Sequence, residues 1–186
     1  NFLNEFGESV PLRSTTALVD DVMGGTLTFS YLFDAGSEDA IKDPAVLREI
    51  ERVQAESDRH TDMVRKTYSI VDFLKDINKT FHDDDPAFHV IPESRELVAQ
   101  YLLLYEMSGG EEANDYVSAD YSRARLEIRS PLVDSARMAS LVDRLNAYLA
   151  REPAVHAQAS LTGMGALWLK LMTYITESQI QGFAAA

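Results

Sequence analysis

The alternation of two hydrophobic periods along the chain is the feature that most constrains its fold. Every second residue from Leu27 to Phe33 is large and apolar, a period typical of a strand with one buried face. A helical spacing follows from Asp43-Pro44, where Asp is a favourable N-cap and Pro fits the first turn. The same succession returns in the second half of the chain, so we expect helices packed on a sheet.

These periods predict four strands and five helices. The strands are expected at 27–33, 64–68, 116–130 and 155–161, with a turn near Asp120 that divides the third into a hairpin. The helices are expected at 43–54, 69–81, 92–108, 134–152 and 164–181. Residues 1–25 are expected to be irregular.

The order of these elements predicts an α+β fold. Two β-α-β units that share one sheet form the split, ferredoxin-like arrangement. We expect a single domain over 1–186, with an inserted pair of helices and a C-terminal amphipathic helix. Its parts are a first half at 24–69, a helical insert at 70–110, a second half at 115–161 and a last helix at 164–183.

Two helices carry further local signals. Ser69 is expected to cap a helix, and Asp72 three residues later makes a variant of the capping box. Pro92 is expected to open another helix, which is apolar over a wide arc and should therefore be buried on more than one side. That arc consists of Leu97, Val98, Tyr101, Leu102, Leu104 and Tyr105.

The charge balance limits the kinds of partner. The formal net charge is −13, so neither nucleic acid nor an anionic membrane surface is expected to bind. The chain has no Cys, which excludes disulfides and thiolate chemistry. It opens without a Met or the apolar core of a signal peptide, and we expect it to be a piece of a longer protein.

The segment His82, Asp83, Asp84, Asp85, His89 is the best metal candidate, because imidazoles and carboxylates are competent ligands. Its spacing matches no established calcium or zinc loop, and a solvated acidic turn is the simpler interpretation. We assign no metal, no cofactor and no catalytic residue to the chain. Neither His60 nor His156 has a Ser or Asp partner at a spacing that would indicate a catalytic triad.

Glycines and arginines give weaker signals. Gly24-Gly25-Thr26 precedes a strand instead of opening a helix, so a backbone role at the strand entry is expected rather than phosphate binding. Gly163 and Gly165 likewise lack the third Gly of a dinucleotide loop. A basic stripe on one strand is expected to pair with nearby carboxylates, and it consists of Arg123, Arg125 and Arg129. A group of tyrosines is expected in the core, and it consists of Tyr101, Tyr105 and Tyr148.

The last expected helix has a large apolar face that contains Trp168 and Tyr174. Such a helix can dock on its own sheet. It can also lie at a membrane surface and lead into a span, because Trp and Tyr favour the boundary between an apolar phase and water.

Six segments carry a family resemblance. They are VPLRSTTALVDDVMGGTLTFSYLF at 10–33, KDPAVLREIERVQ at 42–54, VRKTYSIVDFLKDINKTFH at 64–82, IPESRELVAQYLLLYEMSGG at 91–110, DYSRARLEIR at 120–129 and LTGMGALWLKLMTYITESQIQGF at 161–183. Their order and spacing resemble an extracytoplasmic loop of the resistance-nodulation-division (RND) superfamily of exporters. The branch is the one that handles hydrophobic and amphiphilic molecules, related to the hopanoid and mycobacterial lipid exporters.

This resemblance implies a periplasmic or extracellular porter-type domain, the second of two such loops, within a proton-driven cell-membrane exporter. Family porter modules are ferredoxin-like, and their proton-relay carboxylates lie in the membrane, outside this sequence. The expected partners are the rest of the transporter and a hydrophobic or amphiphilic substrate such as a lipid-like molecule or a drug. The domain itself would do no chemistry, and assembly into homo-oligomers stays open.

Movement of such modules would open and close an apolar cleft, which we expect near the middle helices and the final helix. Two other classes remain open. One is a stand-alone ferredoxin-like ligand-binding or regulatory module, and the other is a metal-dependent enzyme that uses the segment from His82 to His89.

Overall fold

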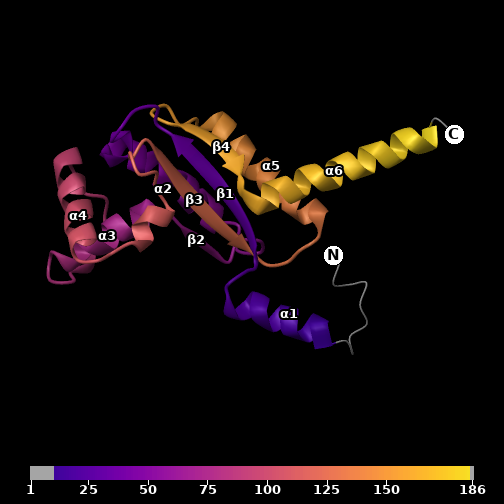
Figure 1. The fold of residues 1–186 in the computed structure, drawn as a ribbon, viewed down its shortest axis with the longest axis horizontal. Coiled ribbons are helices and arrows are strands. Elements are labelled where there is room, and N and C mark those ends of the chain that lie inside the picture. The colour runs from indigo at the N-terminus through magenta and orange to yellow at the C-terminus, as the bar shows by residue number, and fades with distance from the viewer. Residues whose placement is uncertain (1–10, 185–186) are drawn as a thin grey trace.

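A computed structural model describes residues 11–184 of the chain. Its helices and strands, with three short 3-10 helices, follow the chain in one order (Figure 1). They are α1 (Pro11–Val22), β1 (Leu27–Asp34), η2 (Ala40–Lys42), α2 (Pro44–Asp58), β2 (Lys66–Tyr68), α3 (Ile70–Thr80), η3 (Pro86–Phe88), α4 (Arg95–Met107), η4 (Glu112–Asp115), β3 (Arg123–Ser130), α5 (Ser135–Arg151), β4 (Gln158–Thr162) and α6 (Gly163–Ala184).

The four strands form one sheet in the order β2-β3-β1-β4, and every neighbouring pair is antiparallel. The central pair is in register over the whole of β1, from Leu27 opposite Ser130 to Asp34 opposite Arg123. The prediction of an α+β chain is therefore confirmed.

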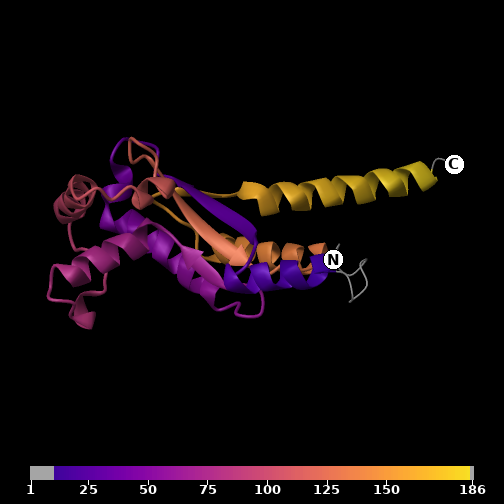
Figure 2. The ribbon, with the colours of Figure 1, turned by 60° about the horizontal axis from the view of Figure 1, so that its bottom comes forward.

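One face of the sheet carries the core. Phe29, Tyr31 and Phe33 are buried on β1, as the period of two predicts, and Leu126 and Ile128 are buried beside them on β3. Helices α2 and α5 cover this face (Figures 1 and 2). They bury one stripe each: Val46, Leu47, Ile50 and Val53 from α2, and Met138, Leu141, Val142 and Leu145 from α5.

The predicted helix starts are confirmed at three caps. Asp43 accepts from the Ala45 N–H (2.8 Å), and Asp134 accepts from the Arg137 N–H (2.9 Å). Ser69 and Asp72 form the capping box. The Asp72 side chain accepts from the Ser69 N–H, and the Ser69 side chain accepts from a backbone N–H of the first helical turn. These side chains satisfy N–H groups that have no partner inside the helix.

The middle helices α3 and α4 lie together at one end of the molecule, far from α6 (Figure 1). Helix α4 begins at Arg95 with Ser94 as its cap, so the expected start at Pro92 is wrong. Its expected burial on more than one side is also wrong: Leu103, Leu104 and Met107 are exposed. Tyr101 is buried as expected, and its hydroxyl donates to Asn78 (3.0 Å). Tyr105 and Tyr148 are partly buried against the core.

The expectation that residues 1–25 are irregular is wrong over Pro11–Val22, which form α1. Residues 1–10 lie outside the described part of the chain. Asp20, near the end of α1, accepts from the Thr26 N–H (2.8 Å) and from the Leu132 N–H (3.2 Å). This carboxylate ties α1 to the start of β1 and to the segment after β3.

The two glycines at the start of β1 have the backbone role that the sequence predicts. Gly24 and Gly25 have φ angles of 65° and 100°, which L-residues rarely adopt. A Cβ on Gly25 would lie 2.6 Å from the Ser130 carbonyl oxygen, so the close approach of the two segments requires glycine.

The third expected strand turns back on itself, as predicted. Val117 bridges to Ala124, and Tyr121 in the turn has a φ of 52°. The fourth expected strand is shorter than predicted, because β4 pairs with β1 only from Gln158 onwards. The amides of Val155 and His156 donate to Glu49 of α2 instead of to a strand.

Candidate functional site

A largely apolar cleft of about 560 Å³ lies beside the first turns of α6. Its walls come from α6, the N-terminal turn of α5, the segment before α5 and the first residue of β1. The lining residues are Leu27, Leu132, Val133, Asp134, Ser135, Met138, Met164, Trp168 and Met172. The size and the apolar lining are typical of a small-molecule site.

Glycines at the start of α6 set its course. Gly163 has a φ of 90° and turns the chain out of β4. A Cβ on Gly165 would lie 2.7 Å from the Phe29 ring, so the first turn rests directly against β1. The rest of α6 runs on past the end of the sheet (Figures 1 and 2). This course leaves Met164, Trp168 and Met172 on one stripe beside α5, at i, i+4 and i+8.

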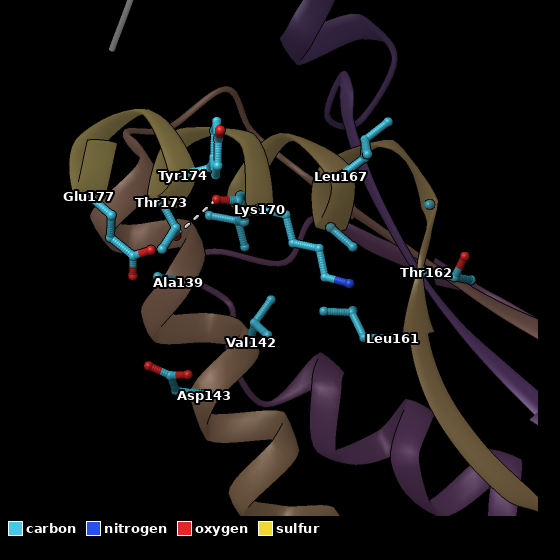
Figure 3. A pocket seen from close by; sticks show the side chains of 13 residues that line it. Ala139, Val142, Asp143, Leu161, Thr162, Leu167, Lys170, Thr173, Tyr174 and Glu177 are labelled. Carbon is cyan, nitrogen blue, oxygen red and sulfur yellow. Dashed lines mark hydrogen bonds between the residues drawn. The ribbon is translucent and has the colours of Figure 1, made fainter. Parts of the chain in front are cut away.

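A second hollow of about 590 Å³ lies between α6, α5 and β4 (Figure 3). Its floor is apolar, with Val142 from α5 and Leu161 from β4, and Lys170 points into it from α6. Asp143 of α5 and Glu177 of α6 also line it, so charged side chains surround the apolar floor. Helix α6 therefore stands between a largely apolar cleft and a hollow of mixed character.

The middle helices also enclose a groove, of about 230 Å³, between α3 and α4. Phe81 and Leu104 line it with Ile77, Tyr105 and polar residues. The middle helices and the final helix lie at opposite ends of the molecule, so they do not form one cleft together. Each region has its own hollow, and the cleft lined by Trp168 and the methionines is the more apolar.

The structure does not bring the residues of the metal candidate together. The ring of His82 stacks on Phe88, with centroids 3.7 Å apart, while His89 pairs with Asp76 (3.1 Å). Asp85 caps η3 through the Ala87 N–H (2.9 Å). Within residues 11–184 no group of three or more His, Asp or Glu side chains is placed to hold a metal ion.

The two isolated histidines have different surroundings. His60 lies 3.9 Å from Glu56, and its Nε2 makes no hydrogen bond among the described residues. The His156 ring donates from Nδ1 to Glu49 Oε1 (2.8 Å), a partner that the sequence analysis missed. No sequence signal identifies this pair, because the two residues are 107 positions apart.

The arginine stripe of β3 is paired with carboxylates, as predicted. Arg123 binds Asp34 of β1 (2.8 Å), and Arg129 binds Glu127 (2.9 Å). Arg125 approaches the other oxygen of Glu127 (3.5 Å). These pairs leave a sheet face of mixed charge, which does not favour an anion site.

The apolar cleft is the arrangement with the clearest chemical meaning. It offers methionine and tryptophan side chains, which adapt to irregular apolar ligands, and few polar groups to fix a ligand's orientation. The sequence analysis identified the apolar face of α6 but not the cleft, because the opposite wall comes from residues 27 and 132–138. No protein-family model, curated protein or solved structure matches the chain.

Proposed function

We propose that this chain is a porter-type extracytoplasmic domain of an RND exporter and forms part of the path of a hydrophobic or amphiphilic substrate. The observation that carries this proposal is the apolar cleft beside α6, lined by Trp168 and three methionines. In this function the domain provides a wall that binds and releases its substrate by apolar contact, and it makes or breaks no covalent bond.

The strand order supports a ferredoxin-like porter module. In the order β2-β3-β1-β4, β1 pairs with β3 and β4, and β2 and β4 form the edges. This order is compatible with two interleaved β-α-β units in an antiparallel sheet. In this interpretation α3 and α4, within 70–110, are the helical insert between the two halves.

The positions where the chain enters and leaves the sheet support an inserted domain. Ser30 in the middle of β1 is opposite Thr162 at the end of β4, so the chain leaves the sheet toward the same end at which it enters. Helices α1 and α6 project from the sheet at this same end (Figure 2). A domain inserted between two neighbouring membrane helices needs this arrangement. Among the described residues, no helix is both long and apolar enough to cross a membrane.

Trp168 provides a direct test of binding, because it is the only Trp in the chain and lines the cleft. It is 43% exposed, so an apolar ligand that fills the cleft should remove water from its ring. We expect lauric acid and N-phenyl-1-naphthylamine, titrated below the micellar range, to shift the Trp168 emission to the blue in a saturable manner.

Two methionines give a matched pair of variants for this titration. Met164 in the cleft is 70% exposed, and Met107 at the far end of α4 is 75% exposed, so both should tolerate a glutamate. Met164→Glu should abolish saturable binding, because it places a carboxylate against an apolar ligand. Met107→Glu should bind like the wild type. Equal binding by all three proteins, or no binding by the wild type, would refute the cleft as the site.

A further inference from the structure

The groove between α3 and α4 exposes large apolar side chains at the end of the molecule away from α1 and α6 (Figure 1). Phe81, directly after α3, is 56% exposed, and Leu104 of α4 is 43% exposed. Both residues line the groove together with Ile77. Large apolar side chains that gather in an exposed groove are typical of a surface on which another molecule docks.

The apolar walls of the groove are held in place by further aromatic contacts. The Phe81 ring stacks on Tyr101, with centroids 5.2 Å apart, and the Tyr101 hydroxyl donates to Asn78 of α3 (3.0 Å). The Tyr105 ring packs against Phe73 of α3 with centroids 6.1 Å apart. The groove is therefore formed before a partner arrives, which lowers the entropic cost of binding.

Carboxylates surround the groove from three segments of the chain. Asp76 of α3 lines it directly, and its side chain is 73% exposed. Asp84 accepts from the Thr80 hydroxyl (3.5 Å), and Glu112 accepts from the Tyr105 hydroxyl. Thr80 and Tyr105 both line the groove. The three carboxylates form an acidic rim, with two on the α3 side and one on the α4 side.

The sequence of this region has a large excess of acidic residues. Residues 70–115 contain eleven Asp and Glu but three Lys and Arg. From Glu96 to Ser122 the chain has no Lys, Arg or His. More than half of the formal net charge of −13 therefore lies in the part of the chain that forms the groove.

The cations of this region do not neutralise the rim. Lys75 binds a glutamate of α2 (2.8 Å), and Lys79 is the other lysine of α3. Arg95 is the first residue of α4, whereas the groove lies at the other end of that helix. The His89 ring pairs with Asp76 (3.1 Å). The lining residues of the groove include no Lys, Arg or His.

We propose that the groove between α3 and α4 binds a basic amphipathic helix of another protein. The apolar stripe of that helix would lie against Phe81 and Leu104, and its Lys and Arg side chains would face the acidic rim. A groove between two helices accepts the side-chain ridge of a third helix, whose apolar anchors recur at i, i+3 and i+4. The rim carboxylates would steer a basic partner to the groove and repel an acidic one.

A second copy of this chain does not supply such a helix. Among the α-helices of residues 11–184, only α5 carries more Lys and Arg than Asp and Glu, and its apolar stripe is buried on the sheet. The groove also lies away from the end at which α1 and α6 project (Figures 1 and 2). A partner bound there leaves that end free for the membrane side of the proposed exporter, and its binding requires neither the apolar cleft nor a ligand in it.

A fluorescent peptide of Leu and Lys, with its Leu residues at helical spacing, is the probe for this groove. Fluorescence anisotropy should show saturable binding to the chain with a dissociation constant in the micromolar range. The same peptide with Glu in place of Lys should not bind. Leu104→Gln should weaken binding of the Lys peptide about tenfold by removing an apolar anchor. Leu171→Gln on α6 is the matched control, because Leu171 is 46% exposed, and it should leave binding unchanged.

A second pair of variants tests the acidic rim. Asp76→Lys and Asp62→Lys change the net charge by the same amount, and Asp62 has a side chain that is 59% exposed in the loop before β2. Asp76→Lys should weaken binding about tenfold by placing a like charge beside the peptide, and Asp62→Lys should have little effect.

Three results would overturn the proposal: no saturable binding of the Lys peptide up to about 100 μM, equal binding of the two peptides, or equal effects within either pair of variants. Light scattering on the chain alone tests the other occupant. Dimers that Leu104→Gln breaks would assign the groove to a second copy and would also overturn the proposal.

Discussion

Glu49 is a buried carboxylate, only 6% exposed, that holds the loop before β4 onto α2. It accepts hydrogen bonds from the N–H groups of Val155 and His156 and from the His156 ring. Burial acts to raise the pKa of Glu49, but these hydrogen bonds outweigh it and keep the pKa below the ordinary value of 4.5. The charged form is therefore the one that stabilises the fold.

We expect Glu49→Ala to lower the free energy of unfolding by about 1–3 kcal/mol, because it removes a charged acceptor of the hydrogen bonds from Val155 and His156. Urea denaturation at pH 7 measures this loss. Glu51→Ala is the matched control on the same helix, since Glu51 makes one half-exposed pair with Lys75 (2.8 Å). That change should cost at most about 1 kcal/mol. Equal losses in the two variants would show that Glu49 is not a special contact.

The lowered pKa of Glu49 also fixes the direction of a pH effect. The stabilisation is fully present above the unfolded-state pKa, near 4.5, and it is lost as the pH falls through the folded-state pKa. The difference in unfolding free energy between the wild type and Glu49→Ala should therefore shrink as the pH falls below about 5. A difference that grows as the pH falls below about 5 would contradict this assignment.

At the scale of single elements, helix α3 depends on a small network around its first turn. Ser69 Oγ accepts from the Val71 N–H (3.2 Å) and donates to Gln54 of α2 (2.6 Å). Gln54 in turn donates to Asp72 (2.9 Å), which accepts from the Ser69 N–H. The capping box is thereby joined to the neighbouring helix.

We expect Ser69→Ala to lower the free energy of unfolding by about 1–2 kcal/mol through loss of the cap and of the contact to Gln54. Ser135→Ala is the control, because Ser135 is an exposed first-turn residue and Asp134 caps that helix. Thermal unfolding followed by circular dichroism compares the two. If Ser135→Ala proves as costly as Ser69→Ala, the network has no special role.

Local signals were enough to predict most elements. The caps at Asp43, Ser69 and Asp134 mark helix starts, and period two marks β1 and β3, because these signals depend on residues within one turn or one strand. The failures have tertiary causes. Helix α1 is held through Asp20 by contacts to Leu132, and the alternation at Val155 reflects a loop held by Glu49.

The candidate site could also not be predicted from local signals, because its walls come from segments that are far apart in the sequence. The apolar stripe at Met164, Trp168 and Met172 is visible as a helical spacing. Nothing in that spacing says that α5 supplies a second wall through Met138, or that a cleft remains between them. Cleft formation depends on the course of α6 after Gly165, which the packing of that glycine against Phe29 determines.

At the scale of the whole molecule, different helices lie at the two ends of the sheet domain. Helices α3 and α4 occupy one end, and α1 and α6 project from the other, where the chain enters and leaves the sheet (Figures 1 and 2). The apolar cleft lies at the second end. An exporter domain with this geometry would present its cleft toward the membrane, the phase from which a greasy substrate comes.

The proposed function places this chain in a proton-driven exporter, and transport by that exporter would test the central claim most directly. Reconstituted into liposomes with a proton gradient, it should move N-phenyl-1-naphthylamine only while the gradient lasts. Met164→Glu should slow this movement severalfold, and Met107→Glu should leave it unchanged. Dye movement that needs no gradient, or that both variants affect equally, would contradict the account of this domain as the wall of an export path.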